Sequence, residues 1–270
     1  MLSRMCSSVA EILGIGVLQG IFEWLPVSSK TIVMLFSSLV LRRPLTISYL
    51  VGLAVQGGTV FAAIVYFRRE VLDIILFKNT KLLTYLIITT FSSCLTGLPI
   101  YIVFTKFLLL REEFVGFITI AIGFILLLQA LVLSRLDTGL KKITDIDIFD
   151  SLVLGLIQGL SIAPGVSRSG VTVATLLYLG YTVDDSLKLS FLASIPVNLG
   201  ATILTITLEE LTTIHLDITL LGLASLVSVI TGFATIKLLL FIAKKYRYKL
   251  TAGLGIVALL IGLATAITIH

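Results

Sequence analysis

Three charged side chains lie within stretches of the sequence that are otherwise apolar. Glu23 and Lys30 fall in a first apolar region at about residues 9–41, and Arg168 falls in a second at about residues 151–181. A charged group at the centre of a bilayer costs about 2.5–3.5 kcal/mol on insertion scales, so such groups are usually functional. One carboxylate facing two cations leaves a surplus positive charge, which calls for an anionic partner in a medium of low dielectric constant. We therefore predict a site for a phosphate-bearing ligand.

Each of these charges also has a simpler interpretation. Glu23 could form a purely structural ion pair with Arg168, and the long side chain of Lys30 could extend to the membrane surface. The two histidines, His215 and His270, lie outside the apolar segments, so these segments offer no imidazole for base or metal chemistry. Any chemistry inside the membrane must therefore use other residues.

Serines follow a proline in both interrupted regions. They are Ser28 and Ser29 after Pro26, and Ser167 and Ser169 after Pro164. Serine is a preferred residue at the start of a helix, and the free N–H groups and the dipole of a helix start favour phosphate binding. We expect a half-helix from each region to point its positive end at the ligand.

The segment at residues 164–172, Pro-Gly-Val-Ser-Arg-Ser-Gly-Val-Thr, is the most specific signal in the sequence. It combines flexible glycines, hydroxyl donors and a guanidinium that can hold two phosphate oxygens. A glycine- and serine-rich packing element is the alternative, but packing alone does not explain an arginine at its centre. Beside Arg168, the residues of this segment predicted to bind substrate are Gly165, Ser167, Ser169 and Thr172.

Gln19 lies four residues before Glu23, so a helix places both side chains on one face, where the carboxylate could act as a base. Gln19 has a counterpart in Gln158 of the second region. The alternative is that these two amides hold helices together through hydrogen bonds. Three further amides are interpreted as helix-packing groups rather than site residues: Gln56, Gln129 and Asn198.

The composition excludes a water-soluble globular protein. The chain has 270 residues, of which 57% are hydrophobic and 13% charged, whereas an average soluble domain has about 25% charged residues. Regular alternation of apolar and polar residues is nearly absent, which argues against an outer-membrane barrel. The net charge of +5 comes from lysines and arginines between apolar segments rather than along one soluble face, so we expect no nucleic-acid partner.

Six uninterrupted apolar stretches are long enough to cross a bilayer, which needs about 20 residues. They lie at about residues 48–67, 82–104, 115–134, 187–207, 217–242 and 250–269. The two interrupted regions resemble each other, because residues 16–20 (Gly-Val-Leu-Gln-Gly) match residues 155–159 (Gly-Leu-Ile-Gln-Gly) at an offset of 139 residues. The chain therefore reads as two homologous halves.

These features predict an all-α polytopic membrane protein with an inverted-topology repeat. A single integral membrane domain spans residues 1–270, with repeat 1 at about 1–138 and repeat 2 at about 139–270. Each half contains a re-entrant pair of broken helices and three transmembrane helices. Because three crossings are an odd number, the two halves lie in opposite orientations in the membrane. The broken helices of both halves then meet near the bilayer midplane, where protein shields their irregular backbone from lipid, so we expect the site there.

The lysines and arginines predict the orientation in the membrane. Under this topology 12 of the 20 lie at one surface and five at the other. The positive-inside rule then places both termini outside the cytoplasm of a multi-pass plasma-membrane protein. Insertion in both orientations is the alternative.

Residues 19–29 and 164–172 resemble the paired signatures of the undecaprenyl-diphosphatase family, also called bacitracin-resistance proteins. The resemblance covers most of the chain and implies a membrane phosphatase that removes the terminal phosphate of a long polyprenyl diphosphate. The monophosphate product is a lipid carrier for envelope or glycan assembly. By the resemblance, Glu23 is the second acidic position of the family motif, with Gln19 a permitted variant of the first, Ser29 is the nucleophile, and Arg168 binds the diphosphate.

The chain departs from this family at one position. Where the family continues Ser-Ser-Thr-Gly-His, this chain has residues 28–32, Ser-Ser-Lys-Thr-Ile, so Ile32 replaces the histidine. Our hypothesis is that Lys30 supplies positive charge to the transferring phosphoryl group instead. The resemblance also implies a divalent cation, Mg²⁺ or Ca²⁺, with Glu23 as its candidate ligand, although one carboxylate is a poor protein site for such an ion.

The sequence therefore predicts hydrolysis of an undecaprenyl- or dolichyl-type diphosphate, with Glu23, Ser29 and Arg168 as catalytic residues. Gln19, Ser28 and Lys30 complete the predicted substrate-binding set. The expected partners are the polyprenyl diphosphate and membrane lipid, and a homodimer is a candidate assembly. A flippase of polyprenyl phosphate carriers is the main alternative, because inverted repeats with broken helices also serve alternating access. A binding or scaffold protein without catalysis is a third.

Overall fold

The computed structural model describes residues 2–104, 139–207 and 221–236, with a few short helical pieces elsewhere. Within these residues the structure is helical throughout, and the one β-type contact is an isolated bridge between Lys141 and Tyr181. Three helical segments are long and apolar enough to cross a membrane: Ile47–Tyr66, Thr80–Val103 and Val183–Thr207. The prediction of an all-α chain with membrane-spanning helices is confirmed for this part of the protein.

The first interrupted region forms a helical hairpin with its turn at residues 23–28. Its elements are α1 (Leu2–Phe22), α2 (Ser29–Leu35) and the π-helical turn η1 (Phe36–Val40). The predicted break around Pro26 is confirmed, as expected for a residue without a backbone N–H. Ser28 is the residue before α2, but its hydroxyl accepts a hydrogen bond from Thr31 Oγ1 (2.7 Å) and makes no side-chain cap to the backbone.

The second interrupted region forms a similar hairpin. Its elements are α8 (Ile148–Gly159), η5 (Leu160–Ile162) and α9 (Arg168–Tyr178). Ser167 caps α9 by accepting a hydrogen bond from Gly170 N at 3.2 Å, as predicted for a serine at a helix start. Gly165 has a φ of +90°, a left-handed conformation that favours glycine, so this turn depends on the glycine beside Pro164.

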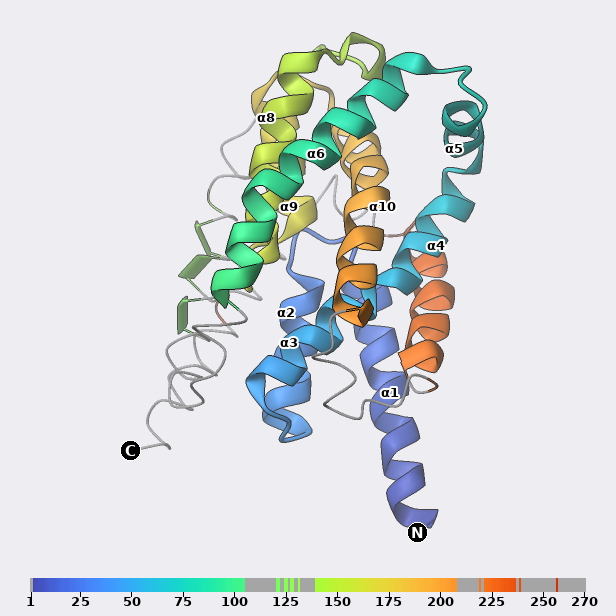
Figure 1. Ribbon diagram of the computed structural model, residues 1–270, viewed down its shortest axis with the longest axis vertical. Coiled ribbons are helices and arrows are strands. Elements are labelled where there is room, and N and C mark those ends of the chain that lie inside the picture. Colours follow the sequence, from blue (N-terminus) through green and yellow to red (C-terminus); the bar gives the residue numbers. More distant parts are fainter. Residues whose placement is uncertain are drawn as a thin grey trace.

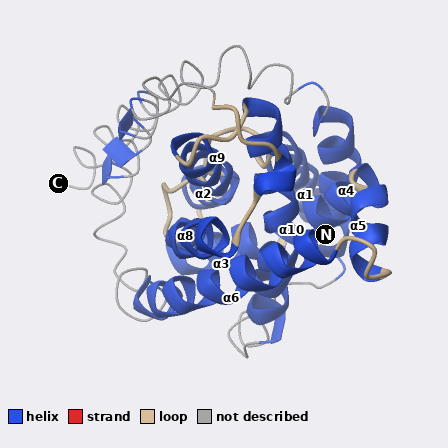
Figure 2. Cartoon of the chain, turned by 90° about the horizontal axis from the view of Figure 1, so that it is seen from above, coloured by secondary structure: helices blue, strands red, loops and turns tan. Residues whose placement is uncertain are grey.

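The two hairpins enter the molecule from opposite ends. In Figure 1, α1 rises from the bottom to the middle, where the chain turns and α2 runs back down. α8 descends from the top to the middle, where the chain turns and α9 runs back up. Seen from above in Figure 2, α9 lies over α2. The first turns of α2 and α9 therefore face each other in the middle of the molecule.

The other described elements are helices, most of which lie around this junction. They are α3 (Leu45–Ala54) and α4 (Gln56–Tyr66), which meet at Val55, then α5 (Arg68–Ile75), α6 (Thr80–Val103), α10 (Val183–Thr207) and the helix at Leu221–Ile236, with a 3-10 turn η4 (Ile143–Asp145) before α8. The predicted spans at 48–67, 82–104 and 187–207 are confirmed with small shifts, and 217–242 agrees with the described helix. The spans at 115–134 and 250–269 lie almost wholly outside the described residues.

Paired glycines let each hairpin approach a serine- and threonine-rich helix closely. A Cβ at Gly16 would lie 2.5 Å from Ala224 O, in the helix at Leu221–Ile236. A Cβ at Gly155 would lie 2.4 Å from Thr89 O, in α6. Gly20 and Gly159, one turn further along, meet equally close neighbours on the same two helices. Both hairpins thus use the Gly-x-x-x-Gly spacing typical of close contacts between membrane helices.

Replacing Gly155 by alanine should destabilise the protein by about 1–3 kcal/mol, because the added methyl group overlaps a backbone oxygen that cannot turn away. Gly222→Ala is the matched control, since a Cβ there meets no heavy atom within 4 Å. Thermal unfolding of the purified protein in detergent measures the difference. Equal unfolding temperatures for the two variants would show that this helix contact is looser than described.

Candidate active site

Glu23 lies directly after α1 and is the centre of a buried hydrogen-bond cluster. Its Oε1 accepts from Arg168 Nη2 at 2.5 Å and from Asn198 Nδ2 at 2.8 Å. Its Oε2 accepts from Gln19 Nε2 at 2.8 Å and from Ser29 Oγ at 2.7 Å. The carboxylate is 5% exposed, so the four donors take the place of water around it. Four helices contribute to this cluster: α1, α2, α9 and α10.

Arg168 is the first residue of α9 and is 7% exposed. Besides the ion pair with Glu23, its Nη1 donates to Ser190 O at 3.3 Å. Its Nε is buried and has no hydrogen-bond partner among the described residues. Buried N–H groups are normally paired, so this one is available to an incoming acceptor such as a phosphate oxygen.

The turns of the two hairpins are joined by hydrogen bonds between side chains and backbone groups. Gly165 N donates to Thr31 Oγ1 at 2.8 Å, and Ser169 Oγ donates to Leu25 O at 2.5 Å. Tyr49, at the start of the Ile47–Tyr66 span, donates its hydroxyl to Ile162 O at 2.8 Å. These bonds fix the first turn of α9 against the first turn of α2, so the ion pair depends on both hairpins.

Lys30 is buried, 4% exposed, and its ammonium donates to Ser161 O and, at 3.4 Å, to Val166 O. The interpretation that its side chain extends to the membrane surface is therefore wrong. The two carbonyls flank the break before α9, where backbone oxygens lack helical partners. Lys30 thus joins the second hairpin from a position on the first.

The remaining predicted binding residues bond to protein groups. Ser167 caps α9, Ser28 accepts from Thr31, and Thr172 Oγ1 donates to Arg168 O at 2.7 Å and lies 2.6 Å from Ser190 Oγ. Together with Ser169 and Gly165 they shape the turns that carry Ser29 and Arg168. The structure therefore brings Gln19, Glu23, Ser29 and Arg168 together and surrounds them with the other predicted residues.

Three site residues were missed or misread in the sequence. Asn198 was interpreted as a packing amide, but its side chain donates to Glu23. Thr31 and Ser190 were not singled out, although they hold Gly165 and Arg168. An amide within an apolar helix was the available signal for Asn198, whereas a threonine or a backbone carbonyl carries no comparable signal.

The position at which the resemblance expects a histidine is filled by Ile32, which packs against the apolar core. The donor set also does not fit a divalent cation. Among the described residues no group of three histidine, cysteine, aspartate or glutamate side chains is placed so that it could hold a metal ion. Glu23 is the one carboxylate in the cluster, and both of its oxygens already accept two hydrogen bonds each. Ions such as Mg²⁺ and Ca²⁺ need several oxygen ligands, which this arrangement does not offer.

The fold and the buried cluster define a helical membrane protein with a polar site enclosed between two broken helices. The chain belongs to the bacitracin resistance protein BacA family, whose sequence profile matches residues 12–263. An undecaprenyl-diphosphatase of Sulfurisphaera tokodaii is 37% identical over 265 residues, 96% of this chain and 98% of that one. Two similar relatives with the same name come from Pyrobaculum islandicum, 36% identical over 87% of this chain and 89% of the relative, and Saccharolobus solfataricus, 33% identical over 94% and 93%.

Proposed function

We propose that this protein hydrolyses a long-chain polyprenyl diphosphate to the monophosphate and inorganic phosphate, which recycles a lipid carrier. The observation that carries the proposal is the contact of Ser29 with Glu23, on the carboxylate that also binds Arg168. This contact joins a nucleophile, a base and a phosphate-binding group in one buried cluster. Membership of a family with relatives named undecaprenyl-diphosphatase supports this substrate class.

The geometry supports a two-step transfer. Ser29 Oγ donates to Glu23 Oε2, so the carboxylate takes this proton as the oxygen attacks the terminal phosphorus. The bond from that phosphorus to the bridging oxygen breaks, and the polyprenyl monophosphate leaves with the proton from Glu23. Water then attacks the phosphorus of the phosphoserine while Glu23 takes a proton from that water. The bond from phosphorus to Ser29 Oγ breaks, inorganic phosphate leaves, and Oγ takes the proton from Glu23. Alternatively, Ser29 orients a water molecule that attacks directly.

Arg168 would stabilise the charge on the transferring group. Its Nε has no hydrogen-bond partner among the described residues, and α9 begins at the junction of the hairpins, where the free N–H groups of its first turn favour an anion. A Mg²⁺ or Ca²⁺ ion remains part of the proposal only as a companion of the substrate, held chiefly by diphosphate oxygens. No step of the mechanism depends on it.

Replacing Lys30 by methionine should lower kcat about tenfold to hundredfold. The substitution removes a charged donor from Ser161 O and Val166 O, and a hydrogen bond to a charged group contributes about 1.5–3 kcal/mol. It also removes the positive charge that we assign to the transferring phosphoryl group. Lys188→Met is the control, because Lys188 pairs with Glu70 and is partly exposed. Undiminished turnover of Lys30→Met at saturating magnesium would contradict both roles.

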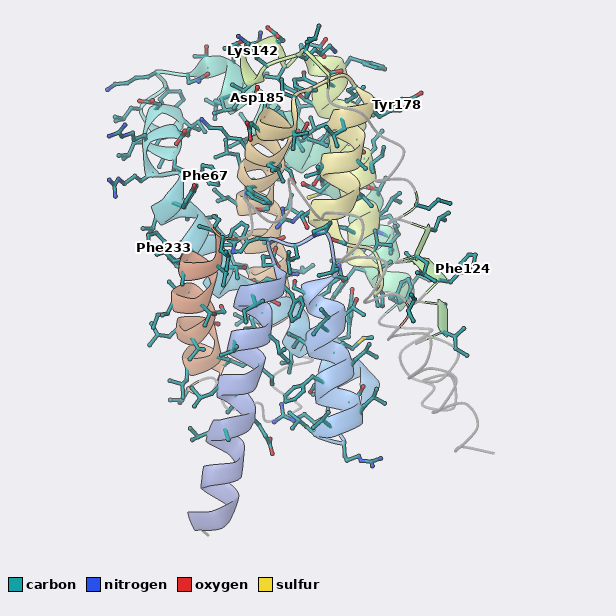
Figure 3. All side chains as sticks on the ribbon, turned by 180° about the vertical axis from the view of Figure 1, so that it is seen from behind. Phe67, Phe124, Lys142, Tyr178, Asp185 and Phe233 are labelled. Atoms are coloured by element: carbon teal, nitrogen blue, oxygen red, sulfur yellow. The ribbon has the colours of Figure 1, made fainter. Side chains whose placement is uncertain are left out.

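We also propose the inverted repeat and the orientation predicted from the sequence. Gly16 and Gly20 of the first hairpin pack on the helix at Leu221–Ile236, which belongs to the second half. Gly155 and Gly159 of the second hairpin pack on α6, the helix of the first half that corresponds to that helix at the 139-residue offset. The hairpins also enter from opposite ends (Figure 1). Lys142 lies at the upper end of the molecule, with α5 at the same end, opposite the start of α1 (Figures 1 and 3). The positive-inside rule makes that end cytoplasmic and places the termini outside. We also propose that the boundary between the two repeats lies near residue 138 and that the protein forms a homodimer.

The test is release of inorganic phosphate from a polyprenyl diphosphate by purified protein in detergent. We expect multiple turnovers, with production of the monophosphate in equal amount. The flippase alternative predicts movement of the lipid between leaflets of a vesicle with no phosphate produced. The absence of phosphate release across a series of isoprenoid diphosphates would overturn the proposed function.

A further inference from the structure

An apolar pocket of about 220 Å³ lies beside the candidate active site. Its walls come from α6 and α10, which run next to each other in Figure 2. Leu53 and Ile162 also line it, so the ends of α3 and η5 take part. The surface of the pocket is almost wholly formed by carbon atoms, so it offers few hydrogen-bonding groups to a ligand.

The pocket adjoins the residues of the buried cluster along the chain. Ile162 ends η5, and the carbonyls of Ser161 and Ile162 accept hydrogen bonds from Lys30 and Tyr49. α10 presents Asn198 to Glu23 and presents the neighbouring Val197 to the pocket. Residues next to each other in η5 and in α10 therefore serve the polar cluster and the pocket.

Two glycines line the pocket, Gly97 of α6 and Gly200 of α10. A Cβ at Gly200 would meet no heavy atom within 4 Å, so this glycine leaves open space, whereas a Cβ at Gly97 would meet the backbone of Gly159. Two other lining residues on α6, Cys94 and Leu98, are exposed. In a membrane these residues would face lipid, so the pocket opens toward the bilayer.

We propose that this pocket binds the first isoprene units of the substrate, an inference that rests on the proposed function. An apolar cavity of about 150 Å³ holds a benzene ring, so the volume found here fits about one or two five-carbon units. A free acyl chain gains little by leaving apolar lipid for an apolar wall. The isoprenoid chain is covalently attached to a diphosphate held by Arg168, which gives it a high effective concentration at the pocket.

Filling the pocket tests the proposal. Gly200→Phe places a ring in the open space, and Gly222→Phe makes the same change where a Cβ also meets no atom within 4 Å but which does not line the pocket. We expect Gly200→Phe to raise KM for a polyprenyl diphosphate roughly tenfold, because the ring takes the space of the tethered chain and so displaces its diphosphate from Arg168. KM for methyl diphosphate should stay unchanged, as should both values in Gly222→Phe. A wild-type KM for the polyprenyl substrate in Gly200→Phe would overturn the proposal.

A second measurement does not need hydrolysis. In a Cys6→Ser background, Cys94 is the one thiol in the chain, and it lines the pocket. We expect polyprenyl monophosphate to slow its alkylation by a maleimide several-fold, whereas inorganic phosphate should not. Unchanged alkylation would overturn the pocket assignment even if phosphate is released. Absence of phosphate release with protection of Cys94 would instead overturn the proposed function and support the pocket.

Discussion

Replacing Arg168 by lysine should lower kcat/KM for a polyprenyl diphosphate by about 10³-fold or more, the range found for arginines that stabilise a transferring phosphoryl group. The guanidinium binds Glu23 through Nη2 and Ser190 O through Nη1, and it keeps Nε free. An ammonium retains the charge but cannot make these contacts in fixed directions at once. The ion pair could survive in this variant, so the loss would fall on substrate binding and transfer.

The chain provides a matched control for this substitution. Arg43 also pairs with a glutamate, Glu11, at 3.3 Å, but both side chains are partly exposed. Arg43→Lys should retain wild-type kinetics. Phosphate release is measured for both variants on protein that elutes as a single species, so that a folding defect is separated from a defect in transfer. Similar rates for the two variants would mean that Arg168 serves the fold and not the reaction.

The breaks of the two hairpins were predictable because their causes are local. Pro26 and Pro164 interrupt an apolar helix, and serines open the next helix, whatever the rest of the chain does. The meeting of Glu23 with Arg168 was also predictable, since unpaired buried charges are too costly to lie apart. These two inferences together predicted that the two hairpins meet through Glu23 and Arg168.

Contacts that involve backbone carbonyls or close helix packing were not predictable in the same way. Lys30 bonds to Ser161 O and Val166 O, and a backbone carbonyl carries no signature in the sequence. No proline marks the junction of α3 and α4 at Val55, so the sequence did not predict this break. There, Gly58 approaches the backbone of Ser225 closely, a contact set by the packing of distant helices. Such features depend on how distant helices pack. A proline break, in contrast, is set by the local sequence, and the pairing of two buried charges follows from the cost of burying either one alone.

Replacing Glu23 by glutamine should lower kcat by about 10²–10⁴-fold, the usual contribution of a positioned base. The amide can still accept from Ser29 but cannot take its proton. The substitution also leaves Arg168 buried without its counter-ion, which costs about 3–5 kcal/mol where one partner of a buried pair is removed. The thermal stability of the variant must therefore be measured beside its rate, with Glu11→Gln as the control from the exposed pair.

Ser29→Ala separates the reaction from the fold, because it keeps the ion pair and removes one hydroxyl from Glu23 Oε2. If Ser29 and Glu23 act on the same proton, the Ser29→Ala/Glu23→Gln double variant should be about as slow as either single variant. The effects of two residues that act as a unit on kcat do not add. Independent contributions would instead multiply the two losses. A Ser29→Ala variant with wild-type stability and wild-type phosphate release would exclude the serine as nucleophile, and a water molecule on Glu23 would then be the attacking group.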